Sequence, residues 1–122
     1  MGADINQKDK CGNTALMMAS EYGCNEVVEL LIQKGADVNA ESNKGWTALM
    51  NASRNDDREI VELLIQNGAD ANQKNNEGQN AMMVATTDEL KKAIIDAVKK
   101  INIKENGTII GSIKNLFERQ EI

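Results

Sequence analysis

The sequence predicts an all-α solenoid, a stack of helix–turn–helix units that bury their apolar faces against one another. Two observations predict this fold class. The first is a period of 33 residues that runs through most of the 122-residue chain. The second is composition: 41% of the residues are hydrophobic but only 2% are aromatic. A core made of aliphatic and small side chains favours packed helices, and 27% charged residues are typical of a soluble globular protein.

Several motifs show the period directly. Gly-Ala-Asp begins at residues 2, 35 and 68, and single glycines follow at residues 12, 45 and 78. The run Glu-Leu-Leu-Ile-Gln occupies residues 29–33 and again residues 62–66. Agreement at this many positions indicates tandem repeats of one supersecondary unit.

The first helix of each unit begins after a residue that can cap it. Thr14, Thr47 and Asn80 stand at equivalent positions, and each side chain can accept a hydrogen bond from the exposed N–H groups of a helix start. Small and apolar residues follow each cap, as in Ala-Leu-Met at 15–17. We therefore expect a short, small-residue helix there.

The second helix of the unit begins near Glu26 and is rich in apolar residues on more than one side. Such a helix needs neighbours on more than one side, which stacking supplies. Gly35 and Gly68 follow the two copies of this helix, where a left-handed residue commonly ends a helix. A polar, turn-rich excursion over residues 37–45 then leads to the next cap.

This unit resembles the ankyrin repeat, whose 33 residues carry Gly-x-Thr-Pro-Leu-His-x-Ala and Gly-Ala-Asp-Val-Asn. Residues 12–19 read Gly-Asn-Thr-Ala-Leu-Met-Met-Ala, and residues 35–39 read Gly-Ala-Asp-Val-Asn. Residues 45–52 and 68–72 repeat both motifs. The resemblance spans roughly residues 2–100, and it implies a solenoid in which each polar excursion is a projecting finger loop.

The resemblance divides the chain into five parts. They are a partial repeat with its finger over 1–13, two repeats over 14–46 and 47–79, a degenerate terminal repeat and finger over 80–107, and a C-terminal capping helix over 108–122. The family's Pro and His are replaced by Ala and Met in all three copies. Losing the Pro costs about 0.4–1 kcal/mol through the entropy of the unfolded chain. Losing the His removes a bond between repeats, for which Met offers packing, so we expect lower rigidity.

The two ends of the stack are expected to differ. Residues 14–33 have the apolar pattern of an interior repeat without a polar outer face. Because repeat arrays need polar terminal units, we expect this N-terminal face to be covered by further repeats or by another copy. Residues 88–100 mix lysines with apolar residues, which suits a terminal unit, and the turn after Ala85 is expected to be about three residues shorter.

Residues 101–108 look like a contracted finger. Residues 108–122 then place apolar side chains on one helical face. This last helix either caps the stack or docks onto another chain.

Charge and cysteine content exclude several classes of protein. The formal net charge is −5 and no run of Lys or Arg exceeds two residues, which disfavours nucleic acid and membrane as partners. The chain has no apolar run of the ~20 residues needed to span a bilayer. Cys11 and Cys24 have neither a CxxC spacing nor a His to complete a zinc site, so we read them as free thiols. A cytoplasmic location is expected.

The sequence predicts no enzyme, no cofactor and no metal. It contains no His, which excludes Ser-His-Asp and Cys-His nucleophile systems. It also lacks a glycine-rich phosphate loop.

Function is therefore expected from the surface. In proteins of the family that this chain resembles, finger tips and the exposed face of the first helix bind partners. Carried over position by position, this implies a partner-binding surface made of Asn13, Met18, Tyr22, Lys44, Trp46, Asn51, Arg54, Asn55 and Gln79.

Each of the larger side chains in this set also has a structural interpretation. Trp46 can pack across the finger onto the neighbouring repeat, and Tyr22 can be a half-buried residue at a helix end. The alternative for Arg54 is a surface ion pair, worth only ~0–1 kcal/mol. Its candidate partners are Asp56, Asp57 and Glu21.

We predict a non-catalytic module that binds another protein and is monomeric or weakly self-associating. The alternative is a structural or self-assembly segment that docks through its N-terminal face or its C-terminal helix. A third possibility is a regulatory arm of a catalytic domain elsewhere in a longer protein.

Overall fold

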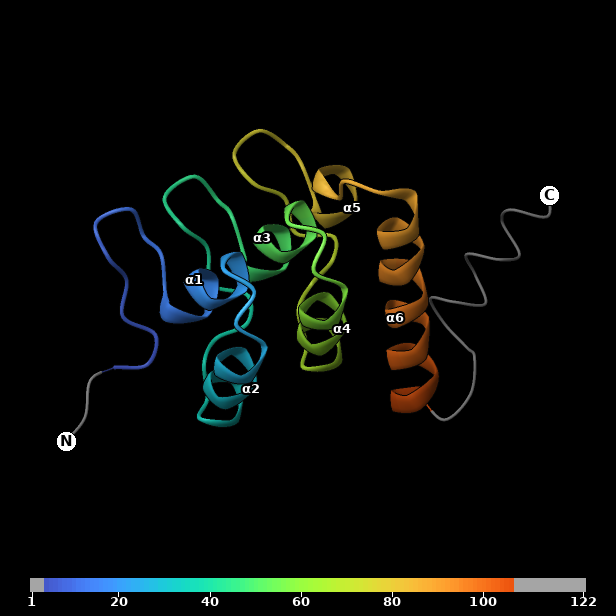
Figure 1. Ribbon diagram of the computed structural model, residues 1–122, viewed down its shortest axis with the longest axis horizontal. Coiled ribbons are helices and arrows are strands. Elements are labelled where there is room, and N and C mark those ends of the chain that lie inside the picture. The colour runs from blue at the N-terminus through green and yellow to red at the C-terminus, as the bar shows by residue number, and fades with distance from the viewer. Residues whose placement is uncertain (1–3, 107–122) are drawn as a thin grey trace.

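The computed structural model describes residues 4–106, and their side chains as far as residue 101 (Figure 1). This part of the chain is helical and contains no strand, which confirms the all-α class. The first helices of the units form one row, made of α1 (Ala15–Glu21), α3 (Ala48–Arg54) and α5 (Ala81–Val84). The second helices form a parallel row, made of α2 (Asn25–Gln33), α4 (Arg58–Gln66) and α6 (Asp88–Asn106).

The predicted caps begin the first helices. Thr14, Thr47 and Asn80 each accept a hydrogen bond from the backbone N–H three residues on, at 3.3, 3.2 and 3.0 Å. Asp57 and Thr87 cap α4 and α6 in the same way, at 3.3 and 3.1 Å. These bonds satisfy N–H groups that have no acceptor within the helix.

Three finger loops project side by side beyond the row of first helices (Figure 1). The backbone N–H of Asn43 donates to the Cys11 carbonyl at 2.9 Å, and that of Asn76 donates to the Lys44 carbonyl at 3.0 Å. The Asn43 side-chain amide also donates to the Lys10 carbonyl at 2.9 Å, and the Asn76 amide to the Asn43 carbonyl at 3.1 Å. The fingers are therefore tied to one another and form one continuous edge.

Glycine is required where one finger touches the next. Gly45 has φ = 80°, and a Cβ added there would lie 2.8 Å from Oδ1 and 2.9 Å from the backbone N of Asn76. No other residue fits both the left-handed backbone and this close approach. The predicted left-handed glycines after α2 and α4 are also confirmed, with φ = 96° at Gly35 and 99° at Gly68.

One aliphatic core runs through the stack. Each first helix packs on the next, each second helix packs on the next, and the two rows meet between them. Its largest fully buried apolar side chains are Leu16, Met17, Val28, Leu49, Met50, Ile60, Val61, Leu64, Leu90 and Ile94.

The methionines that replace the family's His follow the prediction at two of three positions. Met17 and Met50 are each 1% exposed, so these side chains supply packing. Met83 is exposed, because no further first helix follows α5 within residues 4–106.

The shortening of the third unit does not fall where the sequence suggested. Three residues separate α1 from α2, α3 from α4, and α5 from α6 alike. It is α5 that is short, with 4 residues against 7 in α1 and in α3. Ala85 ends it with an extended backbone, at φ = −65° and ψ = 137°. The predicted shorter turn is thus wrong, and the missing residues come from the helix.

The prediction of a finger after residue 100 is also wrong for residues 101–106, which continue α6. Ile94, Ala97, Val98 and Ile101 have helical spacing and pack on or within the core, so the helix continues through this stretch. The predicted helix over residues 108–122 lies outside the described residues. None of the helices within residues 4–106 combines the length and the apolar character needed to cross a membrane.

Candidate partner-binding surface

A hollow of about 660 Å³ lies between the finger tips and the C-terminal ends of α1 and α3. We call it the finger hollow. Five of the nine predicted partner-binding residues line it: Asn13, Lys44, Trp46, Asn51 and Arg54. The rest of its lining comes from Lys10, Cys11, Glu21, Ser42, Asn43, Asn76 and Glu77. Positions far apart in sequence meet there because the 33-residue period places equivalent residues of successive units side by side.

The floor of the finger hollow holds a stacked pair. The guanidinium carbon of Arg54 lies 4.8 Å from the centre of the Trp46 ring, within the range of a cation–π contact. Of the three carboxylates considered for Arg54, the one it approaches is that of Glu21, with 3.7 Å between Nη2 and Oε2. Trp46 is half-buried, so its ring both packs in the stack and remains accessible.

Two predicted contact residues tie the repeats together. Asn51 is only 7% exposed, and its amide donates to the Met17 carbonyl at 3.2 Å. The amide of Asn55 donates to the Glu21 carbonyl at 2.6 Å. Both bonds hold α3 on α1, so these asparagines supply ties between the first two repeats.

The remaining predicted residues lie away from the finger hollow. Tyr22 is 75% exposed at the end of α1 and lines no part of the hollow. Gln79 accepts a hydrogen bond from the Asn75 amide at 3.1 Å, within its own finger. Met18 is exposed on the face of α1 that lies at the N-terminal end of the stack. The structure therefore brings five of the nine predicted residues together in the finger hollow, and the other four do not line it.

Met18 borders a second hollow, of about 790 Å³, at the N-terminal end of the stack. We call it the N-terminal hollow. Its apolar lining consists of Ile5, Ala15, Met18 and Leu31. On the same end of the molecule, Val27 and Leu30 of α2 are exposed. Their equivalents in α4 are Ile60, which is buried, and Leu63, which is half-buried. The apolar positions that stay exposed at this end of the stack are therefore covered in the second repeat.

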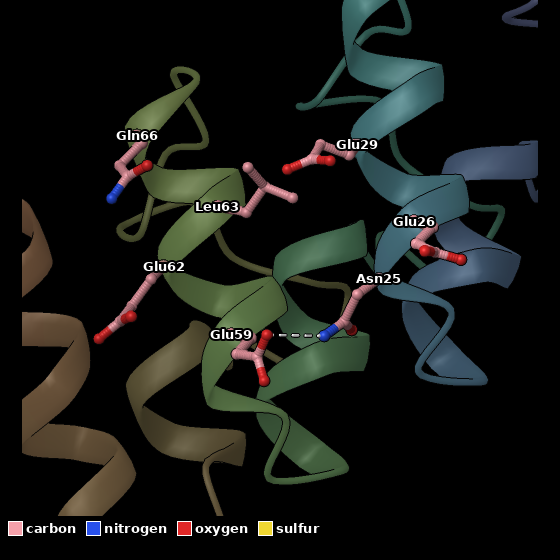
Figure 2. A pocket seen from close by; sticks show the side chains of 7 residues that line it. All are labelled: Asn25, Glu26, Glu29, Glu59, Glu62, Leu63 and Gln66. Carbon is pink, nitrogen blue, oxygen red and sulfur yellow. Dashed lines mark hydrogen bonds between the residues drawn. The ribbon is translucent and has the colours of Figure 1, made fainter.

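A third depression, about 370 Å³ in volume, is strongly acidic, and sequence reasoning missed it (Figure 2). It lies between α2 and α4 and is lined by Asn25, Glu26, Glu29, Glu59, Glu62, Leu63 and Gln66. Figure 2 shows the Asn25 amide donating to Glu59, with 3.0 Å between Nδ2 and Oε2. The signal was present in the sequence: both second helices carry Glu three residues apart at the same place in the 33-residue period.

We call this depression the outer groove. Within the described part of the chain, no group of three or more His, Cys, Asp or Glu side chains has an arrangement that could hold a metal ion. The thiols of Cys11 and Cys24 are free and exposed, and the sequence has no His to activate either of them. Among the described surfaces, the finger hollow thus offers cations and hydrogen-bond donors on a tied framework, which suits binding.

Comparison with known proteins agrees with this architecture. A family model described as ankyrin repeats (3 copies) matches residues 1–75 and 43–109. The crystal structure of the ankyrin repeat domain of Bcl-3, described as a unique member of the IkappaB protein family, is similar with a TM-score of 0.74 and 36% sequence identity. The match covers 77% of this chain and 42% of that one, so this chain spans less than half of its length. A comparison with curated proteins gave no match. The chain belongs to the ankyrin repeat family, as its 33-residue period, its stacked helix pairs and its matched motifs show.

Proposed function

We propose that this chain is a non-catalytic module that binds another protein in the finger hollow. Ankyrin repeats are generally protein–protein interaction modules, which supports the class of function. The observation that carries the site is the stacked pair of Trp46 and Arg54 on the floor of the hollow. Trp and Arg are the residue types that most often dominate binding energy at interfaces, particularly near the centre of a contact.

The framework around this pair favours binding without rearrangement. The fingers are hydrogen-bonded to one another through Asn43 and Asn76, and α3 is tied to α1 through Asn51. A surface that is already ordered loses less conformational entropy when a partner binds. The module thus presents a preformed hollow to a loop or segment of its partner.

The test is an affinity capture from a lysate of the source organism, followed by mass spectrometry. Wild type is compared with Trp46→Ala/Arg54→Ala, which empties the floor of the hollow. Tyr22→Ala is the matched control, because Tyr22 is an exposed aromatic residue outside the hollow. We expect a protein that wild type and the control retain and the double variant loses.

Retention of the same proteins by all three forms, with folding confirmed by circular dichroism, would contradict the finger hollow as the binding site. The catalytic possibility is tested separately. Hydrolase or transferase activity that survives purification and is abolished by a substitution in this chain would contradict the non-catalytic proposal.

A second candidate function is assembly through the N-terminal end of the stack. It is favoured by exposed Val27 and Leu30 and by the apolar lining of the N-terminal hollow. Here the partner is a neighbouring repeat or a second copy. Light scattering behind size-exclusion chromatography tests self-assembly: we expect a mass that rises with concentration and that Leu30→Glu holds at the monomer. A monomer at all concentrations would contradict self-assembly.

The other predictions about partners and location stay predictions. They are a monomeric or weakly self-associating chain, no nucleic acid or membrane partner, and a cytoplasmic location. An oligonucleotide gel-shift assay, a vesicle co-sedimentation assay and localisation of a tagged chain would each test one of them.

A further inference from the structure

We propose that the finger hollow selects an acidic segment of its partner, with a partner carboxylate bound by Arg54 and a second one by the finger lysines. This inference rests on the proposed protein-binding function and names the chemistry of the partner. It starts from a difference in charge between two faces of the molecule. The finger hollow has three cationic side chains against two anionic ones, whereas the lining of the outer groove has four glutamates, of which, within residues 4–101, only Glu62 has a cationic partner, Arg58 at 3.0 Å. The whole chain has a net charge of −5, whereas the side chains that line the finger hollow carry one net positive charge.

Arg54 is held in place but its hydrogen-bonding capacity is unused. The cation–π contact with the Trp46 ring, at 4.8 Å from the guanidinium carbon to the ring centre, holds the group over the ring. The nearest carboxylate oxygen, on Glu21, is 3.7 Å away, which is longer than a hydrogen bond. Within residues 4–101 the Arg54 guanidinium donates no hydrogen bond. A planar guanidinium with free donors is the group best suited to bind a carboxylate in a bidentate manner.

Two lysines extend this positive region onto the fingers. Lys10 and Lys44 lie on successive finger tips, and neither ammonium group makes an ion pair or a hydrogen bond within residues 4–101. By contrast, the Lys8 ammonium on the first finger donates to the Glu41 carbonyl at 2.8 Å. The carbonyls of Lys10 and Lys44 accept hydrogen bonds from the next finger, so both lysines are carried on tied backbone. These two cations are therefore available to a ligand.

The two glutamates of the hollow define its polarity. Glu21 competes for Arg54, but 41% and 51% of these side chains are exposed, and such a pair is worth only ~0–1 kcal/mol, so it opposes a partner carboxylate only weakly. Glu77 stands on the third finger, where the second finger has Lys44. Among the finger residues that line the hollow, the cations thus lie on the first and second fingers, and the third finger contributes a carboxylate.

Peptide display tests this assignment with an unbiased probe. A random peptide library is selected on the full chain, and the affinities of the selected peptides are measured by fluorescence anisotropy at low and physiological salt. We expect enrichment of Asp and Glu. We also expect binding to fall about tenfold or more when the acidic residues of a peptide are changed to Asn and Gln, since charged pairs at an interface are sensitive to truncation.

The protein variants locate the charge effect. Lys44→Glu/Arg54→Glu should weaken the selected peptides about tenfold or more. Lys92→Glu/Lys100→Glu changes the net charge by the same amount on α6, where both lysines are exposed, and should leave affinity unchanged. Arg54→Gln and Lys44→Gln remove positive charge without adding negative charge, and they should weaken binding in the same direction.

The outcomes separate this inference from the proposed function. Peptides that need Trp46 but show no acidic enrichment would overturn the acidic-segment inference and leave the protein-binding function in place. Equal weakening by the α6 control would also overturn it, because the effect would then come from net charge. Tighter binding of a labelled single-stranded oligonucleotide than of any selected peptide would overturn it in favour of a nucleic acid. Failure to select any peptide that needs the hollow would contradict both.

Discussion

The first and second repeats have almost the same sequence pattern, yet the same positions meet different surroundings in the two. Val27 in α2 is 47% exposed, whereas its equivalent Ile60 in α4 is 0% exposed. The inner positions Val28 and Val61, by contrast, are fully buried in both repeats. Val27 therefore lacks the cover that Ile60 has, whereas the inner positions are covered in both repeats.

This comparison shows that one repeat of a solenoid buries only part of its apolar side chains by itself. The pairing of first and second helices within one unit buries the inner positions. The outer positions are buried only if another unit stacks on them. At one such position the residue type also changes, from exposed Met18 in α1 to buried Asn51 in α3, whose amide ties the two helices together.

The largest expected effect comes from truncating the outer apolar position in each repeat. Ile60→Ala should lower the free energy of unfolding by about 2–5 kcal/mol, because it leaves a cavity at a fully buried position of the core. Val27→Ala should cost less than about 1 kcal/mol, because half of that side chain is already in water. Urea denaturation followed by circular dichroism measures both values.

Truncating the inner pair provides the control for this first prediction. Val28→Ala and Val61→Ala should cost similar amounts, since both side chains are fully buried. Equal costs for Ile60→Ala and Val27→Ala would break the comparison, because they would mean that the N-terminal face is covered in solution.

A second prediction moves the comparison to the fingers. Gly45→Ala should destabilise the protein by about 2–4 kcal/mol, the sum of a left-handed backbone and overlap with Asn76. Gly78→Ala has a similar φ of 77° but no atom within 4 Å of the added Cβ, so it should cost only about 1–2 kcal/mol. Thermal or urea unfolding of the two variants gives the difference. A larger cost at Gly78 would show that another element packs on the third finger.

The third prediction concerns the tie between α1 and α3. Asn51→Ala should cost about 0.5–1.5 kcal/mol, the usual net contribution of one hydrogen bond. Met18→Ala, at the equivalent position of the first repeat, should cost less than about 0.5 kcal/mol. Amide hydrogen exchange should show faster exchange in α1 for Asn51→Ala. Unchanged exchange there would mean that the amide bond does not hold the two repeats together.

The smallest effect is expected from the surface ion pairs. Glu21→Gln and Glu62→Gln remove the partners of Arg54 and Arg58, and each should change stability by about 0–1 kcal/mol, because these pairs are exposed. Glu21→Gln should nevertheless increase affinity for an acidic peptide, because it removes the internal competitor of Arg54. The same increase in Glu62→Gln, which lies outside the finger hollow, would contradict this explanation.

Local sequence was enough to predict the repeating unit. The 33-residue period can be read directly from the sequence. Helix capping by Thr14, Thr47 and Asn80, and the left-handed glycines after α2 and α4, depend on interactions within a few residues. For that reason the fold class and the starts of the first helices were predictable. The end of α6 was not, because the residues after Lys100 resemble a contracted finger, while their apolar spacing continues a helix packed on the core.

The binding surface was predictable only in part for the same physical reason. Family resemblance placed Trp46 and Arg54 on the exposed side of the repeat, but their stacking and the contact of Arg54 with Glu21 depend on two units meeting in space. The hydrogen bond made by Asn51 and the gathering of four glutamates of α2 and α4 along the outer groove likewise arise between units. The sequence by itself determined the unit, because capping and turn formation are local. Only the tertiary structure decided which residues are buried, tied or free, because in a stacked protein each unit supplies the surroundings of the next.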